Sequence, residues 1–299
     1  MTEISATLVK TLREKTGAGV MACRTTLAET CGDLDAAVER LRDAQTTMAA
    51  KKADREATEG LVAVAVDGRR GAAVEVNCET DFVARGDDFR RAVSSLAAVT
   101  LATGGDLAAL LAAPSPDGDG SVAHLVTRLT AKTGERIAIR RCVIVEAPSP
   151  GMLASYVHGA AAPGVGVIGV LVALESAAPP ETLAHIGRHV AMHVAASEPR
   201  WVSDADMPAA IVAETRAELL AQARTTGKPE SVVARMVEGR LRKFADEVVL
   251  LRQPFIMNPD ASVDAALAAA SASAGASIRV RSFSRYRVGG GTHADDTTA

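Results

Sequence analysis

The hydrophobic period of this 299-residue chain changes from helical to strand-like at Leu61. Two strand-like runs, LVAVAV at 61–66 and AAVEVNCE at 72–79, are joined by the turn DGRRG, and a predicted helix over 81–102 follows them. The same order recurs in the pair ASYVHG and VGVIGVLVALES, followed by a predicted helix over 181–197. Two copies of strand–strand–helix predict an α+β fold with a core of two related halves, a divergent internal duplication.

Only helices are predicted before this change of period. Apolar stripes with breaks at Gly17, Gly19 and Gly32 indicate three short helices, and Asp33 is placed to cap the third. A unit of about 45 residues is only marginally stable alone. The stretch AAKKADREATEG that follows is charged and lacks large apolar side chains, which predicts a solvated helical linker.

The C-terminal third is mostly helical and charged until its last strand. Gly227 and Pro229 interrupt residues 205–251, which predicts an antiparallel helical hairpin that projects from the core. A Gly-rich polar tail ends the chain, and we expect it to be disordered. The predicted organisation is a three-helix module and linker at 1–56, core subdomains at 57–150 and 151–288, and a disordered tail at 289–299.

Charge, cysteine content and hydropathy exclude several classes of protein. With 33 Lys and Arg against 36 Asp and Glu, the formal net charge is −3, whereas a general nucleic-acid coat needs a strong positive field. Four widely spaced cysteines without a CxxC pair disfavour a disulfide framework or structural zinc, and favour free thiols in a reducing cytosol. No apolar run reaches about 18 residues and no signal-peptide pattern is present, so we expect a cytoplasmic protein without a membrane partner.

Three histidines, His185, His189 and His193, share one face of a predicted helix through i, i+4, i+8 spacing. Two of them could ligate a metal ion, which would suit a metalloenzyme. The segment contains no HExxH and no suitably placed carboxylate. We therefore favour packing against the sheet or a partner, and expect no bound metal.

The last predicted strand, SIRVRSFSRYRV, alternates arginines with other residues. Period-2 spacing puts Arg279, Arg281, Arg285 and Arg287 on one face, beside Phe283. Such a face could bind RNA or could simply be solvated. We favour the solvated face, and an RNA- or ribosome-binding factor is the rival function.

The segment NCETDFVARGDDF places an aromatic residue in a charged turn. The predicted strand ends near Glu79, and Thr80 or Asp81 can cap the helix that follows. Phe82 then lies in the first helical turn, with the spacing of a core residue relative to Phe89. From the residues alone, Phe82 is either a core side chain or an exposed anchor for a partner.

From about Val9 to Val288 the chain resembles the bacterial elongation factor Ts family. The matching segments occur in family order: KTLREKTGAGVMACRTTLAETCGDLDAAVERLR, VNCETDFVAR, SYVHG, HVAMHVAA, GKPESVVARMVEGRLRKF and LLRQPFIMNP. The resemblance implies that the opening module is a three-helix bundle like a ubiquitin-associated (UBA-like) domain. It also implies the two α+β halves and the projecting hairpin. Extra residues in GAAAPGVGVIG depart from the family pattern near His158.

The resemblance further implies a function. Members of the family bind GDP-loaded elongation factor Tu and speed GDP release so that GTP can replace it, without covalent chemistry and without a cofactor. The TDFV signature, carried over as Thr80, Asp81, Phe82 and Val83, would disturb the partner's Mg²⁺ site, with Phe82 as an exposed wedge. We expect no direct nucleic-acid partner. The residues expected to contact elongation factor Tu are Gly17, Gly19, Val20, Met21, His158, His189 and His193.

Overall fold

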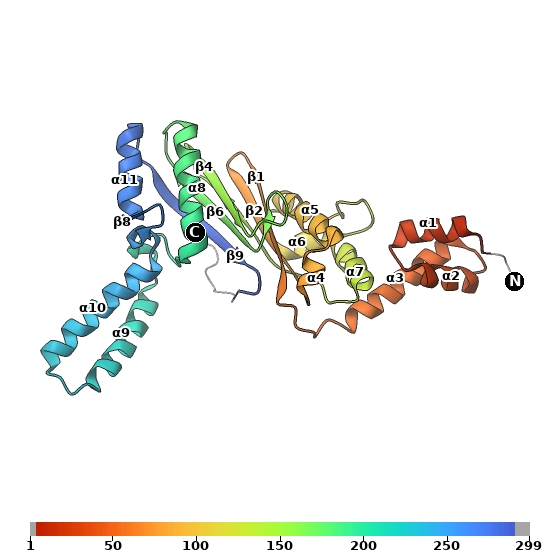
Figure 1. The fold of residues 1–299 in the computed structure, drawn as a ribbon, viewed down its shortest axis with the longest axis horizontal. Coiled ribbons are helices and arrows are strands. Elements are labelled where there is room, and N and C mark those ends of the chain that lie inside the picture. The colour runs from red at the N-terminus through yellow and green to blue at the C-terminus, as the bar shows by residue number, and fades with distance from the viewer. Residues whose placement is uncertain (1–3, 291–299) are drawn as a thin grey trace.

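Two antiparallel sheets pack face to face in the computed structural model, with helices on their outer sides (Figure 1). The structure describes residues 4–290, so residues 291–299 of the tail predicted to be disordered lie outside the described residues. The predicted α+β class is confirmed. Within residues 4–290, no helix combines the length and apolar character needed to cross a bilayer.

Three helices open the chain: α1 (Ala6–Thr16), α2 (Val20–Glu29) and α3 (Leu34–Ala50). The side chains of Ser5 and Asp33 accept backbone N–H groups at the starts of α1 and α3. Gly17 ends α1 in the left-handed conformation, with φ of 65°. The three helices enclose a small core of Leu12, Cys23, Leu27, Ala37, Val38 and Leu41.

The charged linker after α3 is not helical, so that prediction is wrong. From Lys52 onward its N–H groups bond to carbonyls three residues back, which replaces the helix with turns. Its side chains are not all free in solvent either, because two of them contact the surface of the first half of the core domain. Lys52 donates to the carbonyl of Gly134, and Arg55 lies 3.3 Å from Glu79.

The first sheet has the strand order β3-β2-β1-β5. Its strands are β1 (Glu59–Asp67), β2 (Arg70–Cys78), β3 (Ala138–Glu146) and β5 (Val165–Gly166). The helices that pack on its outer face are α4 (Asp81–Ala84), α5 (Asp87–Thr103), α6 (Leu107–Ala112) and α7 (Val122–Thr133). The single helix predicted over 81–102 is therefore two. They separate at Gly86, because its backbone is extended, with ψ of 140°, and its N–H bonds to the carbonyl of Val83.

The second sheet has the order β4-β6-β9, and two helices pack on its outer face. These elements are β4 (Gly151–His158), β6 (Ile168–Glu175), β9 (Arg279–Arg287), α8 (Pro180–Ser197) and α11 (Val263–Ala274). Two further helices, α9 (Ala209–Arg224) and α10 (Glu230–Val248), lie side by side and extend away from the sheets (Figure 1). The short elements near them are η1 (Asp204–Asp206), η2 (Leu250–Arg252), β7 (Pro254–Phe255) and β8 (Asn258–Ser262).

The two halves share one topology. In each, a hairpin is followed by helix and then by a third strand that pairs antiparallel with the second. A register shift interrupts that last pairing in both halves, between Glu75 and Val76 in one and between Ala173 and Leu174 in the other. This shared order agrees with the duplication that the sequence predicts.

A buried carboxylate connects the first sheet to the end of the chain. Glu75 in β2 has no exposed surface. It accepts hydrogen bonds from Arg141 at 2.7 Å, from Arg140 at 3.2 Å and from the N–H of Gly289 at 3.1 Å. Because Arg140 and Arg141 lie in β3 and Gly289 follows β9, this one side chain joins three separate segments.

Candidate functional site

Phe82 is the most exposed large hydrophobic side chain among the described residues, at 85%. It lies in α4, the single turn of helix that follows β2, while Val83 packs against the core beneath. Phe82 is therefore an exposed side chain and not a core residue, so the core interpretation is wrong. Its core-like spacing to Phe89 is misleading because Gly86 separates the two residues into different helices.

The turn that carries Phe82 is held by a residue from elsewhere in the sequence. Thr80 donates to the carboxylate of Glu135 twice, from its N–H at 3.0 Å and from its hydroxyl at 2.7 Å. Thr80 occupies the N-cap position, as predicted, but its side chain makes no cap hydrogen bond to the helix. Asp81 does not cap the helix either and pairs with Arg85 at 2.9 Å.

The strand end before this turn is also fixed by polar contacts. Glu79 accepts the N–H of Arg136 at 2.5 Å, and this bond, together with nearby Arg55, lowers the pKa of the Glu79 carboxyl. The thiol of Cys78 donates to the carbonyl of Thr80, and burial raises its pKa to about 12. At neutral pH the thiol is therefore protonated and serves as a hydrogen-bond donor, not as a nucleophile.

A second exposed apolar surface lies at the turn between α1 and α2. Val20 is 51% exposed and Met21 is 70% exposed, although both stand in a helix that has its own core. Gln45 of α3 donates to the carbonyl of Thr16 at 2.9 Å and so braces the turn from behind. The turn therefore presents two apolar side chains on a supported backbone.

The two glycines of this turn differ in what they need. Gly17 has φ of +65°, which disfavours any side chain, whereas Gly19 has φ of −64° and open space where a Cβ would project. We expect Gly19→Ala to leave thermal stability unchanged and to weaken partner binding, because the added methyl would block close approach. The measurement is binding affinity beside a melting curve. Unchanged affinity would show that Gly19 is not part of the contact surface. Gly17→Ala is the contrasting variant, because its side chain strains the backbone and should lower the melting temperature.

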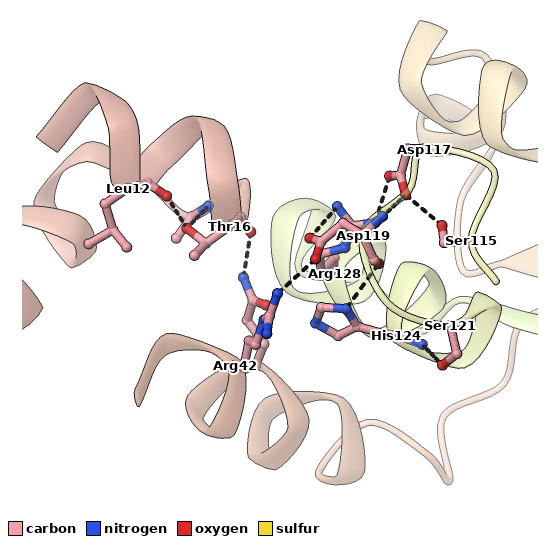
Figure 2. A network of polar contacts seen from close by, with 11 residues as sticks. Leu12, Thr16, Arg42, Ser115, Asp117, Asp119, Ser121, His124 and Arg128 are labelled. Atoms are coloured by element: carbon pink, nitrogen blue, oxygen red, sulfur yellow. Dashed lines mark hydrogen bonds and ion pairs between the residues drawn. The ribbon is translucent and has the colours of Figure 1, made fainter. Parts of the chain in front are cut away.

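Ion pairs hold this three-helix unit against the first half of the core (Figure 2). Arg42 of α3 donates to Asp119 at 2.7 Å, and Asp119 also lies 3.3 Å from Arg128 of α7. Arg128 in turn donates to Asp117 at 2.6 Å. Together with the linker contacts of Lys52 and Arg55, this network gives the turn at 17–21 a defined position relative to α4.

The three histidines have different environments. The rings of His185 and His189 meet edge to face with centroids 4.3 Å apart, whereas His193 is fully buried. The Nε2 of His193 bonds to Gln253 at 2.8 Å, and its Nδ1 accepts the N–H of Ile256 at 3.3 Å. A buried imidazole with both nitrogens engaged does not touch a partner directly, so the expectation for His193 is corrected. Within the described residues, no cluster of metal-ligating side chains is found.

Burial of His193 predicts a dependence of stability on pH. Its folded pKa lies below the ordinary value of 6.5, mainly because burial disfavours the charged ring. As the pH falls, the unfolded chain therefore binds a proton at His193 before the folded chain does. The contribution of the neutral His193 to the free energy of unfolding is fully present above pH 6.5 and is lost as the pH drops below it. We expect His193→Gln to remove this contribution, up to about 1.4 kcal/mol per pH unit. Urea unfolding at pH 7 and pH 5 measures it, with the exposed His185→Gln as the control that keeps the wild-type slope.

His158 and two apolar residues complete the exposed candidates. His158 ends β4 in an exposed position, with Nδ1 3.3 Å from the Tyr156 hydroxyl. Ile256 and Met257 are exposed at the tip between β7 and β8, next to the buried His193. This tip is not among the residues that the sequence predicted to contact a partner. The apolar pair inside LLRQPFIMNP, directly before an Asn-Pro turn signal, was the available clue.

The arginine-rich strand does not form the single face that its alternation predicts. The register shift opposite Ala173 and Leu174 reverses the side-chain alternation along β9, so Phe283 is buried at 3% exposure. Arg285 is mostly buried and bonds to Glu198 at 2.6 Å, and Arg287 lies 3.4 Å from the same carboxylate. Arg281 lies 3.5 Å from Glu175. Acidic neighbours thus neutralise much of the charge that an RNA-binding face would need.

The exposed candidates do not meet in one cavity. Figure 1 shows the three-helix unit at one end of the molecule, the α9–α10 pair at the other, and α4 between them. Small-molecule sites are usually single concave pockets, whereas an extended set of exposed apolar residues suits a protein partner.

Comparison with known proteins identifies similar sequences along the whole chain. The profile of the family described as "Elongation factor TS" matches residues 79–290. A protein named elongation factor Ts from Rhodospirillum rubrum is 46% identical over 298 residues, covering 99% of this chain and 96% of that protein. One of the same name from Maricaulis maris is 49% identical over 294 residues, covering 97% and 94%.

Proposed function

The chain belongs to the elongation factor Ts family of translation elongation factors, and from this premise we propose that it is a guanine nucleotide exchange factor. In this proposal it binds the GDP-loaded form of elongation factor Tu and promotes release of GDP, so that GTP can take its place. It acts without covalent chemistry, without a cofactor and without direct nucleic-acid contact, in the cytoplasm.

The observation that carries the proposal is the exposed Phe82 on a braced turn. An exchange factor shifts an equilibrium only if it binds the nucleotide-free partner more tightly than the GDP-bound one. A rigid aromatic side chain can meet that condition if the pocket that it binds on the partner forms only after the partner's Mg²⁺ site has been disturbed. Loss of Mg²⁺ removes positive charge from beside the diphosphate and so speeds GDP release. Thr80, Asp81, Phe82 and Val83 are the residues assigned to this step.

Two further surfaces are assigned to binding without exchange. One is the turn at 17–21, with Val20 and Met21, on a module that we take to be UBA-like and to span residues 1–56. The other, on the second subdomain at 151–288, includes His158, His189 and the Ile256–Met257 tip. Contacts at separate points of a rigid chain raise the affinity for the partner through effective concentration. The Phe82 turn then does not have to supply that affinity, and its contact can be used to speed GDP release.

The test is release of labelled GDP from elongation factor Tu, with and without this protein. We expect faster release when the protein is present, and a smaller effect when excess Mg²⁺ competes with the wedge. Equal release rates in both arms would sink the proposal. The rival function, RNA binding, is separated by salt, because phosphate contacts weaken steeply between 50 and 200 mM salt, roughly 1,000-fold or more for several contacts.

A further inference from the structure

We propose that Glu135 is the positioning residue for the Phe82 turn, an inference that rests on the proposed exchange function. Its carboxylate accepts both hydrogen bonds that Thr80 donates, although the two residues are 55 positions apart. Because Thr80 immediately precedes α4, these bonds determine where α4 begins and which way Phe82 projects.

The Phe82 turn lacks the devices that usually hold a short helix in place. α4 has only four residues, and no side chain of its own caps its first N–H groups. A single turn of helix does not persist by itself, because forming the first turn orders several residues for one hydrogen bond. An 85% exposed Phe82 adds no packing that could fix the turn. Val83 and the buried Ala84 hold the turn against the core, and Glu135 fixes its N-terminal end with two charge-assisted bonds.

Glu135 is itself held in place to do this. Gly134 ends α7 in the left-handed conformation, with φ of 74°, which turns the chain sharply toward β3. The N–H of Glu135 then bonds to the hydroxyl of Thr133 at 3.2 Å. The next residue, Arg136, donates its N–H to Glu79. Residues 135 and 136 are therefore hydrogen-bonded to both residues of the dipeptide 79–80. A preorganised Phe82 side chain loses little conformational entropy when it binds its pocket on the partner.

Glu135 acts on the rate of stimulated GDP release and not on the affinity for elongation factor Tu. Without its anchor, Phe82 still exists and the other surfaces still bind, but the turn samples many orientations. Only the fraction of complexes with the wedge correctly placed then releases GDP quickly. The expected signature is a lower maximal rate of stimulated release with an almost unchanged half-saturating concentration.

The experiment measures stimulated GDP release against concentration of the full-length protein, for wild type and variants. We expect Glu135→Ala to lower the maximal rate about 10-fold, equivalent to about 1.4 kcal/mol. The half-saturating concentration and the melting temperature should stay close to wild type. Thr80→Val, which removes the hydroxyl that donates to Glu135, should lower the maximal rate in the same direction. Glu146→Ala, at a half-exposed carboxylate of β3, is the matched control.

A second measurement needs no partner. In the free protein, amide hydrogen exchange over residues 80–85 should become faster in Glu135→Ala and stay unchanged in Glu146→Ala. A wild-type maximal rate in Glu135→Ala, or unchanged amide exchange, overturns the positioning role. A fall in melting temperature that accounts for the lost rate also overturns it in favour of a purely structural role. If amide exchange rises as expected while the wild-type protein stimulates no GDP release, the anchor stands and the exchange function is what fails.

Discussion

Phe82→Ala is expected to abolish most of the stimulated GDP release and to leave the protein as stable as before. An exposed side chain away from packing contacts changes the free energy of unfolding by no more than about 0.5 kcal/mol. A central aromatic anchor in a partner interface costs about 2 kcal/mol or more when truncated, which is roughly a 30-fold loss of rate if the contact forms only in the exchange step. The measurement pairs a melting curve with the rate of labelled GDP release at saturating concentration.

Phe89→Ala is the matched control for this prediction. Phe89 is 2% exposed in the first turn of α5 and packs in the core of the first half. Its truncation should cost about 3–5 kcal/mol of stability, while the folded fraction should still stimulate release. The wedge mechanism fails if Phe82→Ala behaves like Phe89→Ala, with a large loss of stability and normal exchange by the molecules that remain folded.

Among the described residues, Glu75→Gln is expected to be the most destabilising single change of charge. The substitution removes a fully buried negative charge that contacts Arg140 and Arg141 and receives the N–H of Gly289. Neutralising the buried member of such an ion pair costs about 3–5 kcal/mol, because the Arg141 side chain, 12% exposed, stays mostly out of water beside it. Urea unfolding measures this loss, and the C-terminal strand should show faster amide exchange.

Glu146→Gln is the control for the buried pair. Glu146 lies 3.8 Å from Arg70, and both side chains are about half exposed. Surface pairs of this kind contribute about 0–1 kcal/mol, so the control should melt close to the wild type. Equal losses for Glu75→Gln and Glu146→Gln would show that the buried carboxylate does not join the two sheets.

Local patterns in the sequence were sufficient for most of the elements and for their order. The change from helical period to alternation at Leu61, the glycine breaks at 17–19 and 32, and the repeated strand–strand–helix order predicted the α+β class and both halves of the core. These features depend on residues within a few positions of one another, where backbone preference and amphipathic spacing decide the outcome. The role of TDFV came only from the family resemblance, since a Phe at core-like spacing is ambiguous by itself.

The tertiary structure decided which side chains are exposed and what holds them. Phe82 is exposed because Gly86 splits the expected helix, and its turn is anchored by Glu135 from 55 positions away. His193 is buried because the segment after α10 returns with Gln253 and Ile256 to occupy both ring nitrogens. A register shift in β9 sends Phe283 into the core and Arg285 onto Glu198. Each outcome depends on contacts between distant segments, and the spacing of neighbouring residues carries no information about which distant segment will arrive.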